Sequence, residues 1–253
     1  MILLLFLSVD YDIIYEAFDY LPQNGDKDMK SRTAQLIYQS VYCAFALIGV
    51  IGSVGFFKYY FTWDFYIYFT NISSYLCFGV MLAELIQTAK RKDDDYVATC
   101  PKIKFISMLG TLLTFMVFNI MIAPDQTPQF IVAVECILFH IVLPIMFILD
   151  WLMFYEHGKV RWTYPLISSI FPLAYCGYVL IHAAILGFDT SIVNSIGTDP
   201  LIYPYFFFNP DKVGYGGIAM WVAILLAAFI VIGYLFFGVD RLLYKRKNSS
   251  ITK

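Results

Sequence analysis

Six long apolar segments recur along this chain, and they decide what it can fold into. They cover residues 36–57, 65–89, 103–123, 130–154, 164–186 and 215–237. Each is long enough to cross a hydrocarbon layer about 30 Å thick, which takes about 20 helical residues. Backbone N–H and C=O groups find no water inside a bilayer, so these segments must satisfy them internally as helices. The sequence therefore predicts an all-α, polytopic membrane bundle of six transmembrane helices.

Composition and the lengths of the connections support the same class. Only 14% of the 253 residues are charged, whereas soluble domains carry about 25%. The connections have about 6 to 28 residues, which is too short for a separate soluble domain, so any activity must lie in the bundle and its loops. We predict a cytosolic or interfacial leader at 1–35, a six-helix domain at 36–243 and a basic cytosolic tail at 244–253.

Basic residues predict the orientation of the bundle. If both chain ends share one side of the membrane, that side collects 15 of the 17 Lys and Arg residues, and only Lys58 and Lys212 lie opposite. The positive-inside rule then places both termini in the cytosol. We expect an integral multi-pass protein, of the plasma membrane if the chain is microbial.

Several classes of site and partner are not indicated. The five cysteines are an odd number without C-x-x-C spacing, so neither a disulfide framework nor a zinc site is expected. No sequence motif points to a metal or an organic cofactor. The net charge of -2 argues against a nucleic-acid partner, and membrane lipid or a lipid ester is the partner that we expect.

Ionisable residues inside the spans are few, and each is a candidate functional residue because a charge near a helix centre costs about 2.5–3.5 kcal/mol on insertion. They are Glu84, Glu135, His140, Asp150 and His182. Glu84 and His182 lie near the ends of their spans, where water or a basic neighbour satisfies them. For Asp150 we expect an ion pair with the following loop, which carries Lys159 and Arg161.

His140 lies deepest, among apolar neighbours. Pro144 follows four residues later and leaves the carbonyl of His140 without its helical hydrogen bond, so we expect a kink and a cavity there. On the predicted span ends His140 is about 15 Å below the outer surface, and Thr70 in span two about 7 Å. By type and position alone, each of these residues favours a structural hydrogen bond.

A set of motifs resembles a known family. The set comprises the threonine of "YFT" at 68–70, "HIVLP" at 140–144 followed by Asp150, "YPY" at 203–205 and "GVDRLL" at 238–243. Together they resemble the androgen-induced-gene family of six-span membrane proteins, and most closely its microbial branch. The resemblance covers roughly residues 36–243.

That resemblance implies an intramembrane hydrolase of lipid esters, similar to hydrolases of fatty acid esters of hydroxy fatty acids. It implies Thr70 as the nucleophile and His140 as its base. We expect Asn71, Tyr203 and Tyr205 to contact the substrate. Next to Thr70, the side chains of Asn71, Ser73 and Ser74 either donate to the oxyanion or hydrogen-bond to other helices.

Two other functions stay open. One is a carrier or lipid-binding bundle with a polar track of Glu135, His140 and Asp150, although their spacing scatters them around a helix. The other is a scaffold without small-molecule chemistry, which would be favoured if Thr70 and His140 faced lipid or lay on helices that never meet.

Overall fold

The computed structural model describes residues 27–58, 63–91, 100–131, 133–188 and 202–251. Six of its helices are long and apolar enough to cross a membrane, which confirms the predicted all-α bundle and makes the chain an integral multi-pass membrane protein. Most of the predicted N-terminal leader lies outside the described residues.

The spanning helices follow the predicted order, with shifted ends. They are α3 (Lys27–Ser53), α4 (Phe69–Lys90), α5 (Pro101–Val117) with the π turn η3 (Phe118–Ile122), α7 (Val134–Ile137) with the π turn η5 (Leu138–Val142) and α8 (Leu143–Phe154), α9 (Tyr164–Ser168) with α10 (Ile170–Phe188), and α12 (Pro210–Ile251). Helix α3 thus begins inside the region predicted as a leader, and α12 continues through most of the predicted tail.

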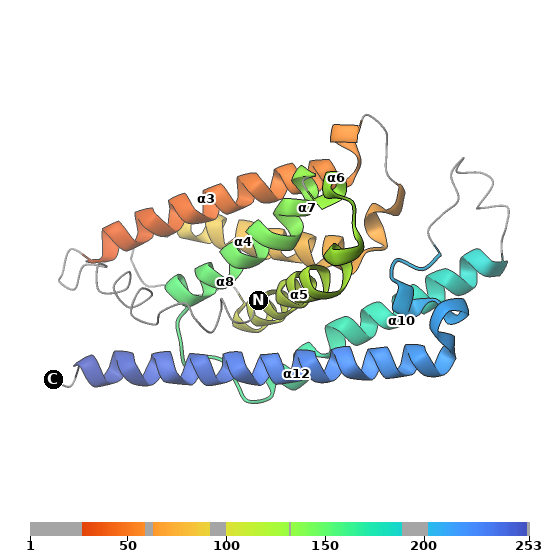
Figure 1. The fold of residues 1–253 in the computed structure, drawn as a ribbon. Helices are drawn as coiled ribbons and strands as arrows, with labels where there is room; N and C mark the ends of the chain where they lie inside the picture. The colour runs from red at the N-terminus through yellow and green to blue at the C-terminus, as the bar shows by residue number, and fades with distance from the viewer. Residues whose placement is uncertain (1–26, 59–62, 92–99, 132, 189–201, 252–253) are drawn as a thin grey trace.

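Short helical turns connect these spans. They are η1 (Phe56–Lys58), η2 (Trp63–Tyr66), η4 (Ala123–Asp125), α6 (Pro128–Ile131) and η6 (Phe206–Phe208). All five lie at the end of the bundle that the positive-inside rule places outside, and we name it the outer end. The start of α3 and the end of α12 lie together at the opposite end (Figure 1), which we name the inner end.

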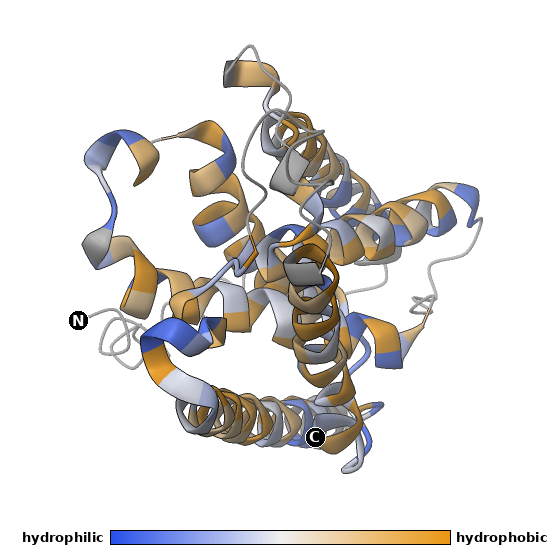
Figure 2. Ribbon diagram, turned by 90° about the vertical axis from the view of Figure 1, so that its right-hand side faces the viewer, coloured by the Kyte–Doolittle hydropathy of each residue, from blue (hydrophilic) through white to orange (hydrophobic). Residues whose placement is uncertain are grey.

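The helices form two groups (Figure 1). Helices α3, α4, α5 and α7–α8 pack together, and α10 and α12 lie along one side of them. Viewed along the bundle in Figure 2, apolar residues surround the spanning helices, as expected of helices in contact with both lipid and each other. Aromatic and aliphatic side chains fill the interior, among them the fully buried Trp151, Phe105 and Phe147.

A buried ion triad joins three helices in the inner half of the bundle. The Lys104 ammonium on α5 lies 2.6 Å from a Glu84 carboxylate oxygen on α4 and also contacts the Asp150 carboxylate on α8. The exposed fractions of these side chains are 0%, 3% and 0%. The prediction that Asp150 pairs with the following loop is therefore wrong, because its partner is Lys104. Lys159 of that loop instead pairs with Glu156 at the surface.

The loop after α8 is fixed to α12 by Asp240. This fully buried carboxylate accepts hydrogen bonds from the backbone N–H groups of Gly158 at 2.9 Å and Val160 at 3.3 Å. Gly158 has a φ of 90°, which L side chains rarely adopt, and a Cβ there would lie 2.5 Å from the ring of Tyr244. The loop conformation therefore requires glycine at this position.

Candidate functional site

Two π turns carry the residues of the site at the outer end of the bundle. In η5 the N–H of Leu143 donates to the carbonyl of Leu138, and η3 interrupts the end of the third span in the same way. Pro144 lies two residues after the end of η5, and its missing N–H leaves the carbonyl of His140 open, as the sequence predicted. The side-chain amide of Asn119, on η3, fills that gap by donating to this carbonyl at 3.2 Å.

Thr70 and His140 meet across the interface between α4 and η5. The Thr70 hydroxyl oxygen lies 3.3 Å from Nε2 of His140. Thr70 is the second residue of α4 and is 8% exposed. The two residues predicted to work together are therefore adjacent, on helices that do pack against each other.

The neighbours of His140 fix its tautomer and its ring. Nδ1 lies 2.9 Å from the carbonyl oxygen of Cys136. A carbonyl only accepts, so Nδ1 carries the ring hydrogen, and Nε2 of the neutral ring accepts the hydrogen bond from Thr70. The ring of Phe118 stacks on the imidazole with centroids 3.7 Å apart and planes 22° from parallel. The imidazole is thus held with its basic nitrogen toward the threonine.

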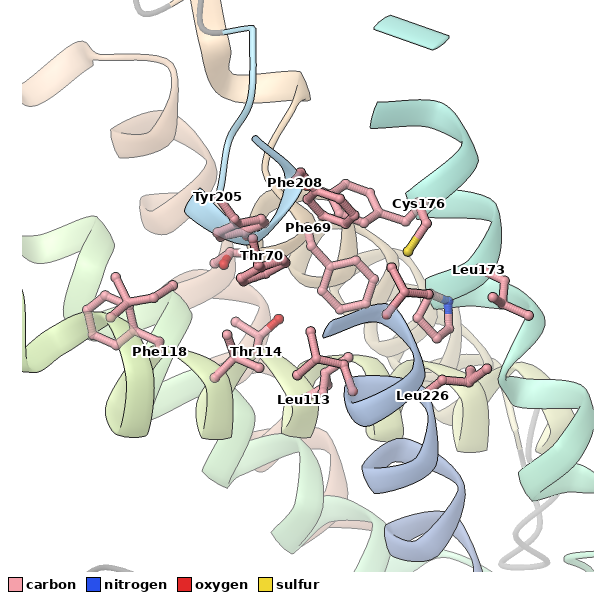
Figure 3. Close-up of a pocket in the computed structure, with 17 residues that line it drawn as sticks. Phe69, Thr70, Leu113, Thr114, Phe118, Leu173, Cys176, Tyr205, Phe208 and Leu226 are labelled. Atoms are coloured by element: carbon pink, nitrogen blue, oxygen red, sulfur yellow. The ribbon is translucent and has the colours of Figure 1, made fainter. Parts of the chain in front are cut away.

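Thr70 lines an apolar pocket between α4, α5, α10, η6 and α12 (Figure 3). The pocket holds about 620 Å³ of space between its lining atoms, including the part open to the surroundings. None of the described lining residues carries a charged side chain, and most are aliphatic or aromatic. Leu173 lines the pocket and is 43% exposed, so the wall of the pocket includes a residue at the surface of the bundle.

The other predicted site residues divide into two groups. Tyr205 lines the pocket beside Thr70 (Figure 3). Asn71 instead donates its side-chain amide to the carbonyl of Phe65 at 2.8 Å and does not line the pocket. Tyr203 packs against the apolar cluster under η6 and also lies outside the pocket lining.

The two serines after Thr70 differ in their contacts. Ser73 donates to the Thr70 carbonyl at 3.1 Å and shares a hydrogen bond of 3.0 Å with Thr114 on α5, as expected of an interhelical partner. Ser74 is buried, and its hydroxyl has no hydrogen-bond partner among the described residues. Both are part of the packing between α4 and its neighbours.

Three residues near the site had not been predicted. Asn119 and Phe118 hold the histidine, and Thr114 lines the pocket. The amide of Asn119 inside an apolar span was the available sequence signal, because a polar side chain there needs a partner. Phe118 carries no such signal, since aromatic residues are common throughout these spans.

Comparison of the chain with protein-family models, with curated proteins and with solved structures found no match. The resemblance to the androgen-induced-gene family therefore depends on the short motifs around Thr70, His140 and Tyr203–Tyr205.

Proposed function

We propose that this protein is an intramembrane hydrolase of lipid esters, with Thr70 as the nucleophile and His140 as the general base. One observation carries the proposal: the Thr70 hydroxyl, in the lining of an apolar pocket, lies 3.3 Å from an unprotonated imidazole nitrogen. A threonine hydroxyl is a weak nucleophile until a base removes its proton, and a positioned neutral histidine is suited to that role.

The proposed reaction has two steps. In the first, the Thr70 oxygen attacks the ester carbonyl carbon while its proton moves to Nε2 of His140. The tetrahedral intermediate then expels the alcohol oxygen, which takes that proton, and an acyl-threonine ester is left. In the second step water attacks this ester, His140 accepts the proton of the water and returns it to the Thr70 oxygen, and the fatty acid leaves.

The apolar lining of the pocket favours an acyl chain as the part of the substrate that binds there. Burial of each methylene group contributes about 0.8 kcal/mol, and the uncharged lining offers no partner for an ionised head group. Thr70 lies one residue below the start of α4, near the membrane surface, where water for the second step is available. Substrate enters from the lipid between α10 and α12, beside the exposed Leu173.

The test is covalent labelling of the purified protein in detergent with a fluorophosphonate, which reacts with activated hydroxyl groups. We expect Thr70→Val and His140→Ala to lose labelling and Thr70→Ser to keep it. Thr114→Val is the matched control, because Thr114 lines the same pocket but bonds to Ser73. Labelling that persists in Thr70→Val, or that is absent from the folded parent protein, would contradict the proposal.

A further inference from the structure

Tyr205 is held rigidly over the start of α4. Its ring stacks on Phe207, with centroids 5.1 Å apart and planes 7° from parallel, and meets the rings of Tyr68 and Tyr175 edge-on at 6.1 and 6.5 Å. Figure 3 shows Tyr205 beside Thr70 in the pocket lining. The position of the phenol is therefore set by aromatic contacts on several sides.

The Tyr205 hydroxyl lies beside the N-terminus of α4. The first N–H groups of a helix have no partner within it, and the side chain of the residue before the helix, Tyr68, makes no capping hydrogen bond. The backbone of Phe69 and Thr70 and the side chains of Thr70 and Tyr175 lower the pKa of the Tyr205 phenol, so these groups lie close to its oxygen. A residue far along the chain is thus adjacent to the open end of α4.

The hydrogen bond to His140 leaves the Thr70 oxygen as an acceptor. The Thr70 hydroxyl donates its single hydrogen to Nε2 of His140, at 3.3 Å, so a neighbouring phenol meets a lone pair of the Thr70 oxygen. Donors at the positive end of a helix polarise a phenol beside it and strengthen its own donation.

The other hydroxyl groups in the pocket lining are already occupied. Tyr175 donates to the carbonyl of Ile67 at 2.8 Å, and Thr114 shares a hydrogen bond with Ser73. Burial raises the pKa of Tyr205 above its usual range, and the hydrogen bonds from α4 offset only part of that rise. The phenol therefore keeps its proton at neutral pH and remains a donor.

We propose that Tyr205 is the catalytic oxyanion donor of this site. The inference rests on the proposed hydrolase function and adds a group that contacts the reacting oxygen. When the Thr70 oxygen bonds to the ester carbonyl carbon, the carbonyl oxygen gains the negative charge beside the phenol. The Tyr205 O–H then turns from the Thr70 oxygen to this oxyanion, and no proton is transferred. Removal of one such donor lowers kcat by about 10²–10³ in other acyl-transfer enzymes.

The experiment compares Tyr205→Phe with Tyr215→Phe in the hydrolysis of p-nitrophenyl decanoate in detergent. Tyr215, near the start of α12, lies outside the pocket lining and is 82% exposed, so its change is the matched control. We expect kcat to fall about 10²–10³-fold in Tyr205→Phe with little change in KM, and to stay within threefold of the parent in Tyr215→Phe. Equal rates in the two variants would overturn the assignment.

A second pair of variants separates the donor from the packing of the Tyr205 ring at the start of α4. Tyr205 is replaced by 4-aminophenylalanine, which keeps a donor at the ring, or by 4-methylphenylalanine, which has similar size and no donor. We expect only the amino variant to retain hydrolysis. The parent should hydrolyse the oxoester faster than the corresponding thionoester, and we expect the methyl variant to lose this preference. If both replacements hydrolyse the ester equally well, Tyr205 is not the donor.

Failure of the underlying function gives a different result. If hydrolysis by the parent protein is absent or unchanged in Thr70→Val, the proposed hydrolase function fails. If Thr70→Val abolishes hydrolysis while Tyr205→Phe leaves it intact, only the role of Tyr205 fails.

Discussion

Replacing Lys104 with methionine tests the buried ion triad. The change leaves the carboxylates of Glu84 and Asp150, 3% and 0% exposed, without the ammonium between them. Removing one partner of a buried ion pair costs about 3–5 kcal/mol. In a chain of this size each kcal/mol shifts the Tm by about 2–4 °C, so we expect the Tm of Lys104→Met to fall by about 6–20 °C.

Thermal unfolding in detergent, followed with a thiol-reactive fluorescent dye, measures this loss, because Cys77 and Cys136 are buried and react when the bundle opens. Lys159→Met is the control. Its pair with Glu156 is 3.4 Å long and about half exposed on both sides, and exposed pairs contribute about 0–1 kcal/mol. If Lys104→Met melts at the same temperature as Lys159→Met, the reasoning is refuted.

A combined variant shows whether charge causes the loss. Adding Glu84→Gln and Asp150→Asn to Lys104→Met replaces both carboxylates with neutral groups of similar shape. We expect this triple variant to recover most of the lost Tm, because no uncompensated charge stays buried. A triple variant as unstable as Lys104→Met would assign the loss to packing of the lysine chain.

Three further predictions follow from other contacts. Asp240→Ala should lower the free energy of unfolding by about 2–6 kcal/mol, since two backbone N–H groups lose their acceptor at about 1–3 kcal/mol each. Asp240→Asn keeps an acceptor oxygen, so its Tm should fall less in the same thermal assay. Gly110→Ala should cost about 1–3 kcal/mol through overpacking, because its Cβ would lie 2.8 Å from the ring of Phe171, whereas Gly177→Ala meets nothing within 4 Å and should be neutral. Asn119→Leu should slow fluorophosphonate labelling about two- to thirteenfold, the rate equivalent of a hydrogen bond worth about 0.5–1.5 kcal/mol. An unchanged rate would remove Asn119 from the positioning of His140.

The number of spans could be predicted from the sequence because length and apolarity are local properties. The meeting of Thr70 and His140 could not be derived in this way. Counting from the predicted helix ends separated them in depth by about 8 Å, because it assumed that the two spans begin at the same level. Thr70 is the second residue of α4, whereas His140 lies six residues beyond the start of α7. Since their side chains touch, the helix that carries His140 begins further out.

The ion triad was missed for a related reason. Lys104 lies at the edge of an apolar segment, and the orientation argument had counted it with the basic residues of the preceding loop. Asp150 was paired with the nearest basic residues along the chain, although residues 46 positions apart on packed helices proved to be the partners. The partner of a buried charge depends on which helices pack together, and a single sequence does not contain that information.

The hydrogen bond from Nδ1 of His140 to the Cys136 carbonyl has a consequence for the electrical behaviour of the protein. Among the described residues that nitrogen bonds to a carbonyl oxygen, which does not take up a proton, so a proton taken from Thr70 at Nε2 must leave again from Nε2. In the proposed cycle the proton therefore travels out and back over one short distance within the outer half of the bundle. Turnover moves no net charge through the bilayer, and its rate should be the same at any membrane voltage.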